Sequence, residues 1–137
     1  MRAVTIGLCM VLATACFAQD RFKSGQLAGF TISPTEHIIN TFDSELTVRE
    51  MKGTIALETN GNPLNGALVE IRGPGDRKTV LAGTTSSSGE FLIRNVPAGE
   101  YVFKITMGGY QSLMGQLIVD QRTQHPKPIH FQLKPGS

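Results

Sequence analysis

The side chains of this chain that could act as acids, bases or metal ligands are few and scattered. Its three histidines, His37, His125 and His130, do not have the spacing of a metal-binding or nucleophilic motif. His130 stands between Ile129 and Phe131, so in a strand its side chain points away from the face that these two share. We therefore expect no metal site, no cofactor and no catalytic histidine.

The hydroxyl and carboxyl side chains lead to the same expectation. Ser86 to Ser88 precede Gly89 without the G-x-S-x-G pattern of a nucleophile elbow, and small polar residues before glycine are typical of a turn. Carboxylates are spread over predicted strand ends and outward positions, where charge stays hydrated. They are Glu58, Glu70, Glu90, Glu100 and Asp120. The sequence predicts a protein that is not an enzyme.

The charge balance argues against a nucleic-acid partner. The 137 residues carry 13 Lys and Arg and 11 Asp and Glu, a formal net charge of +2. Without residues 1–18, which contain Arg2 and no acidic residue, the charge is 12 − 11 = +1. Proteins that bind phosphate backbones carry clustered basic residues. The densest basic group here, Arg72 with Arg77 and Lys78, is better explained as a solvated loop.

Residues 1–18 have the pattern of a cleavable export signal. Arg2 is followed by a mostly apolar run from Ala3 to Phe17, and small residues precede the end of this run. We expect cleavage after Ala18 and hence a periplasmic or extracellular protein. Both cysteines, Cys9 and Cys16, would leave with the signal, and an exported domain without cysteine is more typical of bacteria.

Two alternatives to cleavage stay open. A membrane anchor would need roughly 20 apolar residues, and the run is shorter than that. Lipid attachment at Cys16 is the second alternative, because Ala13-Thr14-Ala15-Cys16 resembles a bacterial lipobox, although the usual leucine three residues before the cysteine is missing. We expect a protein without a membrane span.

The rest of the chain divides into a lead-in, residues 19–50, and a regular domain, residues 51–135. The lead-in contains Gly25, Gly29 and Pro34 but also many large apolar residues, which a flexible linker would not carry. We expect it to be partly ordered, with a strand at Leu46 to Arg49. The apolar residues of the lead-in are Phe30, Ile32, Ile38, Ile39, Phe42, Leu46 and Val48.

Seven short alternating runs, separated by turn residues at the spacing of a sandwich or barrel, predict an all-β domain. Alternation with a period of two gives each strand one buried face, for example Phe103 and Ile105. The turn Val96-Pro97-Ala98-Gly99 predicts a hairpin between the strands of Phe91 and Tyr101. The runs are Gly53 to Glu58, Ala67 to Arg72, Thr79 to Thr85, Glu90 to Arg94, Glu100 to Met107, Leu113 to Asp120, and Pro128 to Lys134.

Two stretches, GTIALETNGNPLNGALVEI and TSSSGEFLIRNVPAGEYVFKITMGGY, resemble the carboxypeptidase regulatory-like domain. The resemblance covers Gly53 to about Leu133. It implies an all-β fold, a seven-stranded antiparallel β-sandwich of the transthyretin-like type, which performs no chemistry itself and is usually attached to secreted or envelope proteins. The resemblance therefore implies a binding or structural accessory module that contacts a protein or cell-envelope partner through its surface.

A carbohydrate-binding module, possible because starch-binding-like domains share this architecture, is the alternative function. Glycan sites normally offer exposed aromatic rings, and the chain has no tryptophan. Tyr110 is the candidate ring, although packing at the end of the core explains it better.

Four apolar residues fall on the outward phase of four different strands, and they are the candidate interaction face. A patch of this kind on a solvated sheet needs a cover. Either the lead-in folds back over it, or a partner protein binds there. The four residues are Leu68, Leu92, Val102 and Ile118.

Overall fold

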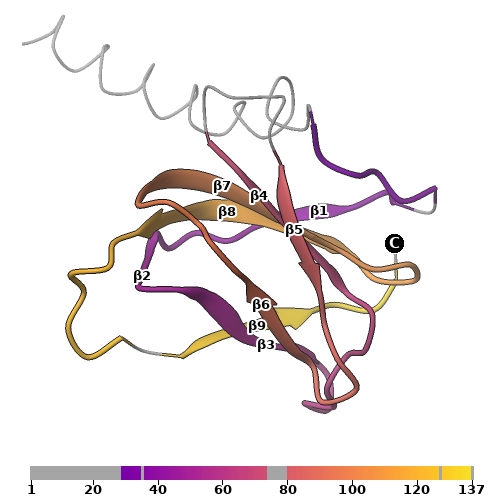
Figure 1. Ribbon diagram of the computed structural model, residues 1–137. Coiled ribbons are helices and arrows are strands. Elements are labelled where there is room, and N and C mark those ends of the chain that lie inside the picture. The colour runs from indigo at the N-terminus through magenta and orange to yellow at the C-terminus, as the bar shows by residue number, and fades with distance from the viewer. Residues whose placement is uncertain (1–28, 35, 74–79, 127, 137) are drawn as a thin grey trace, which may run out of the picture.

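The structure is a computed structural model that describes residues 29–34, 36–73, 80–126 and 128–136. The export signal predicted at residues 1–18 lies outside the described residues. The described part of the chain is all-β and contains nine strands (Figure 1). They are β1 (Ile39–Thr41), β2 (Leu46–Val48), β3 (Met51–Leu57), β4 (Leu68–Arg72), β5 (Leu81–Thr84), β6 (Glu90–Ile93), β7 (Gly99–Thr106), β8 (Ser112–Val119) and β9 (Ile129–Leu133).

The strands form two sheets that pack face to face (Figure 1). Sheet A has six strands in the order β1-β8-β7-β4-β5, with β2 also paired to β8. Sheet B has three strands in the order β6-β3-β9. The seven predicted runs all correspond to strands, β3 to β9, so the predicted sandwich is confirmed.

The structure corrects the strand count and the direction of pairing. The strand expected at Leu46 to Arg49 is present as β2, and a further short strand, β1, precedes it. Both run parallel to β8, and β9 runs parallel to β3. The sandwich is therefore a mixed one. Alternating side chains reveal the buried face of a strand but carry no information about the direction of its neighbour.

The predicted hairpin between the strands of Phe91 and Tyr101 is wrong. β6 pairs with β3 in sheet B, whereas β7 pairs with β4 and β8 in sheet A. Residues 94–98 therefore carry the chain from one sheet to the other, with Asn95 at a φ of 59°. The hydroxyl of Tyr101 donates to the carbonyl oxygen of Pro97 at 2.7 Å and holds this crossover.

The core lies between the sheets and is built from the predicted inward residues. Phe103 is completely buried on β7, and its ring packs on Phe131 of β9 with centroids 4.9 Å apart. Gly115 on β8 leaves room for it, since a Cβ there would lie 2.6 Å from the Phe103 ring. The buried core also includes Ile55, Ala67, Val69, Ile71, Phe91, Ile93, Ile105, Leu117, Val119, Ile129 and Leu133.

The lead-in is part of the fold and contacts the sandwich in two places. Phe42 follows β1 and enters the open side between the sheets, where its ring meets those of Phe103 and Phe131 edge-on, with centroids 6.2 and 5.6 Å away. Phe30 packs with Ile39 against Val102 and Met114, on the outer face of sheet A. Residues 29–34 and 36–48 thus add two strands to sheet A and cover part of its outer face.

Candidate functional site

The outer face of sheet A, opposite the core, carries buried charge. Lys104 on β7 is completely buried, and Glu70, its cross-strand neighbour on β4, is 5% exposed. The Lys104 Nζ lies 2.8 Å from Oε1 of Glu36 and donates to the carbonyl oxygen of Thr31 at 2.7 Å. The Glu70 carboxylate accepts the backbone N–H of Thr31 at 3.0 Å and its hydroxyl at 3.1 Å. Residues of the lead-in therefore supply a partner for each of these two charges.

Two further contacts complete the cover of this face. Ser112 on β8 donates its hydroxyl to the Glu36 carboxylate, and its backbone N–H donates to the carbonyl oxygen of Ile38 at 3.0 Å. The Arg72 guanidinium lies over the ring of Phe30, 4.8 Å from its centroid, which is a cation–π geometry. Lys104, Glu70, Ser112 and Arg72 thus all contact residues of the lead-in.

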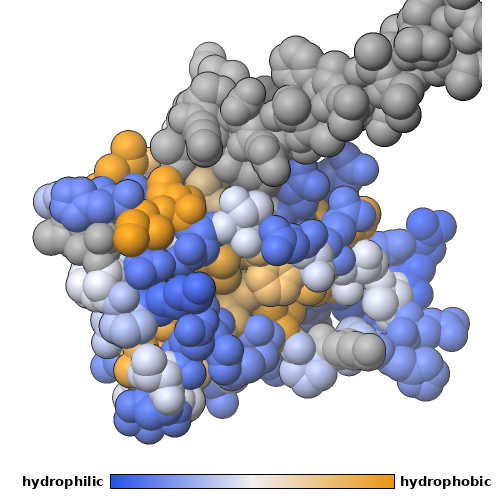
Figure 2. All heavy atoms as spheres, turned by 180° about the vertical axis from the view of Figure 1, so that it is seen from behind, coloured by the Kyte–Doolittle hydropathy of each residue, from blue (hydrophilic) through white to orange (hydrophobic). Residues whose placement is uncertain are grey.

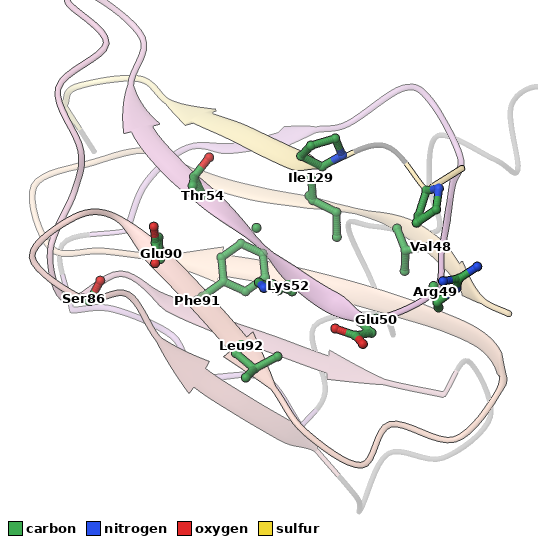
Figure 3. Close-up of a pocket in the computed structure, with 13 residues that line it drawn as sticks. Val48, Arg49, Glu50, Lys52, Thr54, Ser86, Glu90, Phe91, Leu92 and Ile129 are labelled. Atoms are coloured by element: carbon green, nitrogen blue, oxygen red, sulfur yellow. The ribbon is translucent and has the colours of Figure 1, made fainter. Parts of the chain in front are cut away.

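The outer face of sheet B has no such cover from the described residues. A groove of about 730 Å³ crosses it, formed by β3, β6, the start of β9 and the residues before β3 (Figure 3). Leu92 on β6 is 42% exposed there, beside the exposed side chain of Lys52 on β3. The groove is lined by Val48, Arg49, Glu50, Lys52, Gly53, Thr54, Ser86, Glu90, Phe91, Leu92, Pro126, Pro128 and Ile129.

The connection from β8 to β9 forms one wall of this groove, through Pro126 and Pro128. The connection begins with a turn at Asp120. The Asp120 carboxylate accepts the backbone N–H of Arg122 at 2.9 Å and the Arg122 guanidinium at 3.2 Å. These hydrogen bonds hold the pKa of Asp120 below its ordinary value. Arg49 binds the same connection by donating from Nε and Nη2 to the carbonyl oxygen of Thr123, from Nε at 3.1 Å.

One row of polar side chains crosses sheet B next to the groove. Glu90, Thr54 and His130 are cross-strand neighbours on β6, β3 and β9, and Thr54 Oγ1 lies 2.7 Å from His130 Nδ1. In a nucleophilic triad the histidine stands between the hydroxyl and the carboxylate. Here the threonine stands between them, so the carboxylate is not placed to orient the imidazole or to stabilise its protonated form, as the carboxylate of a triad does.

The four residues of the predicted interaction face do not share one face. Leu68, Val102 and Ile118 lie on β4, β7 and β8 of sheet A, whereas Leu92 lies on β6 of sheet B. Val102 is 2% exposed because Phe30 covers it. Only Leu92 borders a groove on an uncovered sheet face, and no local sequence signal assigns β6 to one sheet or the other.

The remaining predicted residues are scattered. Tyr110 is half-buried against the core and forms an isolated bridge with Pro135. His37 and His125 are exposed. Among the described residues no three His, Cys, Asp or Glu side chains come together in a group that could hold a metal ion. The described part of the chain also has no helix with the length and apolar character that a bilayer crossing requires.

The groove itself was not predicted from the sequence. Pro126 stands in a polar connection without a strand pattern, whereas Pro128 and Arg49 were expected at the ends of two separate strands. Tertiary contacts bring these segments to the edge of sheet B. The two prolines near the end of the connection are a local signal that could have drawn attention to this wall.

The folding pattern and the arrangement of its surfaces define an all-β sandwich domain. The family model of the carboxypeptidase regulatory-like domain matches residues 50–134, which is more than half of the chain, so this chain belongs to that family. The family match begins just after β2, and the lead-in strands β1 and β2 therefore lie outside it.

Two solved structures are similar to the chain. The 5-hydroxyisourate hydrolase of Klebsiella pneumoniae is 17% identical with a TM-score of 0.46, over 67% of this chain and 90% of that one. The 3-chlorocatechol 1,2-dioxygenase of Rhodococcus opacus 1CP is 15% identical with a TM-score of 0.44, over 77% of this chain and 69% of that one. No curated protein sequence matches the chain.

Proposed function

We propose that the protein is an exported, non-catalytic binding module that contacts a protein partner of the cell envelope through the groove on the outer face of sheet B. The observation that carries this proposal is the difference between the two outer faces. Lead-in residues such as Phe30 and Glu36 cover sheet A, whereas the described residues leave the groove around Leu92 open. Leu92, Pro126 and Pro128 are all exposed and line the same groove, and exposed apolar surface that is gathered in one place is typical of an interaction site.

The chemistry of the groove supports binding over catalysis. It combines apolar surface from Leu92, Pro126 and Pro128 with the charges of Lys52 and Glu90. Mixed apolar and charged linings of this kind are suited to a protein surface, whose own charges can pair at the rim. The hydroxyl–imidazole contact at the border of the groove has the wrong order for a triad.

A carbohydrate ligand receives less support from the described residues. Stacking on a sugar needs an exposed aromatic ring. The seven aromatic residues that the structure describes are all buried or half-buried, including the predicted candidate Tyr110. They are Phe30, Phe42, Phe91, Tyr101, Phe103, Tyr110 and Phe131.

Export is the second part of the proposal and depends on the residue pattern of residues 1–18. Cleavage after Ala18 would leave a chain that begins at Gln19 and contains no cysteine. A periplasmic or extracellular location would place the groove where envelope proteins can reach it.

A pull-down that depends on single groove residues tests the proposal. Residues 19–137 are immobilised and exposed to an envelope extract, and retained proteins are identified by mass spectrometry. Leu92→Ser and Lys52→Glu should each abolish retention of the specific partner. Leu68→Ser makes the same apolar-to-polar change on sheet A and is the matched control, which should retain the partner.

Two results would overturn the proposal. The first is a partner that is retained equally by the wild type and by both groove variants, since the groove would then have no role in binding. The second is a result on a glycan array, run in parallel: the wild type binds a defined polysaccharide and Leu92→Ser does not. That outcome would make carbohydrate the ligand of the groove.

A further inference from the structure

The two sheets do not end at the same place on one side of the sandwich. Sheet A continues past β8 with β1 and β2, whereas sheet B ends at β9. Phe42, between β1 and β2, and Leu46 on β2 turn toward the core from this overhang, and both remain half-buried. Sheet B has no strand opposite the overhang among the described residues.

On this side β9 has no partner strand among the described residues, and its backbone presents hydrogen-bonding groups there. The N–H of Glu58 donates to the carbonyl oxygen of Leu133 at 3.0 Å, so the odd-numbered residues of β9 bond to β3. In a parallel ladder the backbone groups of alternate residues point to opposite sides. The N–H and C=O groups of His130 and Gln132 therefore point away from β3. Lys134, the next even-numbered residue, shows the same direction, because its carbonyl oxygen accepts the N–H of Gln111 at 2.9 Å.

A hollow of about 620 Å³ lies beside this edge, between β9 and the residues that follow β1. Figure 2 shows the side of the molecule opposite to Figure 1, where apolar side chains appear in a hollow framed by hydrophilic ones. The hollow is lined by apolar Phe42, Leu113 and Leu133 and by polar residues around them. The polar lining consists of Asn40, Thr41, Asp43, Ser44, Glu58, Gln111, His130, Gln132 and Lys134.

We propose that this hollow binds an extended peptide segment of a partner protein, which adds to β9 as a fourth strand of sheet B. The free N–H and C=O groups of His130 and Gln132 are spaced two residues apart, and the ligand that satisfies such a pattern is another extended backbone. Alternate side chains of the segment point to the half-buried Phe42, which requires an apolar residue at every second position. This site is separate from the groove around Leu92 and does not depend on it.

The charged residues and the ends of the hollow indicate the charge and the length of the segment. Its charged lining is Asp43, Glu58 and Lys134, which favours a basic residue on the segment. At one end Gln111 occupies the carbonyl oxygen of Lys134, so strand addition stops there. β9 has five residues, so the segment that pairs with it is also about five residues long, or roughly 17 Å.

Binding is tested with the peptide Lys-Val-Thr-Val-Thr-Val-Lys, acetylated and amidated at its ends, added to residues 19–137. Amide hydrogen exchange measured by NMR should show fast exchange at His130 and Gln132 in the free protein. Saturating peptide should slow the exchange of both amides at least tenfold. Two control peptides should each bind more weakly. One has the same composition with the three valines in a block, and the other has glutamate in place of lysine at both ends.

Two variants separate backbone recognition from other binding. Gln132→Pro removes the outward N–H at an edge position where proline is tolerated, and should weaken peptide binding about five- to tenfold. Gln132→Ala keeps the N–H and is the matched control, which should bind as the wild type does. Two further peptides, one N-methylated at the threonines and one at the valines, test the same bonds from the other side, because the direction of the added strand decides which set of N–H groups faces β9. This test does not depend on whether Gln132→Pro folds.

The proposal is wrong if the alternating peptide shows no saturable binding. It is wrong, too, if the amides whose exchange the peptide slows belong to the Leu92 groove. It is also wrong if both N-methylated peptides bind as well as the parent. Sedimentation could show that residues 19–137 form a dimer and that Gln132→Pro dissociates it. The edge of β9 would then bind a second copy of the chain, and the assignment to a partner segment would be overturned. A failed pull-down with the Leu92 groove would leave this test unaffected.

Discussion

Lys104 and Glu36 form an ion pair of 2.8 Å between β7 and the lead-in, and their side chains are 0% and 5% exposed. The pair crosses the boundary between the family sandwich, which begins at residue 50, and the segment before it. Because Lys104 points away from the core, it would be hydrated if the lead-in were absent. The lead-in therefore buries a charge and at the same time neutralises it.

Glu36→Gln should destabilise the protein, because it leaves the Lys104 ammonium buried without its nearest carboxylate. Removing one partner of a buried ion pair costs about 3 to 5 kcal/mol, and we expect the lower end, since Glu70 remains beside Lys104. Urea denaturation measures the loss. Glu45→Gln, at an exposed glutamate of the same segment, is the control and should change the midpoint little. Equal midpoints for the two variants would contradict this account.

Deleting residues 19–47 should lower the melting temperature and promote self-association. The deletion removes Phe42 from its contacts with two core rings and uncovers Val102 and Met114. Each lost kcal/mol lowers the midpoint by about 4 to 8 °C in a domain of this size. Differential scanning calorimetry and sedimentation velocity measure the two effects. A truncated domain that melts like the longer chain and stays monomeric would show that the lead-in adds no stability.

Gly115→Ala should destabilise the core by about 1 to 3 kcal/mol through overpacking. The added Cβ would lie 2.6 Å from the Phe103 ring and 2.9 Å from the Cβ of Phe42. Chemical denaturation of Gly108→Ala is the comparison, because a Cβ at Gly108 meets nothing within 4 Å. Phe103→Leu should partly rescue Gly115→Ala. If the two alanine variants unfolded at the same denaturant concentration, the close approach of β8 to the Phe103 ring would be wrong.

Stability above pH 10 should depend on Tyr101. Burial raises the pKa of its phenol above the ordinary value of about 10, so the folded state holds this proton more tightly than the unfolded state. The contribution is present below the unfolded pKa and is lost as the pH rises through the folded one. Urea midpoints of the wild type should therefore fall more steeply above about pH 10 than those of Tyr101→Phe. Parallel curves for the two proteins would exclude Tyr101 as the cause.

The exported protein should begin at Gln19. The apolar run before Ala18 is shorter than a membrane span, and the pattern around Cys16 lacks the leucine of a lipobox. Intact-mass analysis of protein from the periplasm or medium should give the mass of residues 19–137. A mass that includes acyl chains on Cys16 would place the protein on a membrane instead, and Cys16→Ser would then abolish that modification.

The side chains of each strand that face the core were predictable from the sequence, because the alternation that reveals them involves only neighbouring residues. Phe103 and Ile105 alternate with polar or smaller residues, and only one of the two faces of a strand can enter the core. The same reasoning placed Val102 on the outward phase, which is correct. It could not show that Val102 is buried there, since the cover comes from Phe30, about 70 residues earlier.

The candidate site was less predictable. Leu92 and Val102 have the same outward phase and look equivalent in the sequence, yet they lie on different sheets. Lys104 stands between the inward residues Phe103 and Ile105, and nothing in this pattern indicates that it is buried. Its burial depends on Glu36, which no periodic pattern connects with it.

The amino-acid sequence by itself determined that the chain forms a β-sandwich of this family and which residues face its core, because alternation and turn residues act within a few positions along the chain. The tertiary structure decided which sheet each strand joins, which outer face the lead-in covers, and which edge stays open at β9. These choices depend on hydrogen bonds and packing between segments far apart in the sequence, such as Thr31 with Glu70 and Gln111 with Lys134. Such contacts form only when the whole chain has folded.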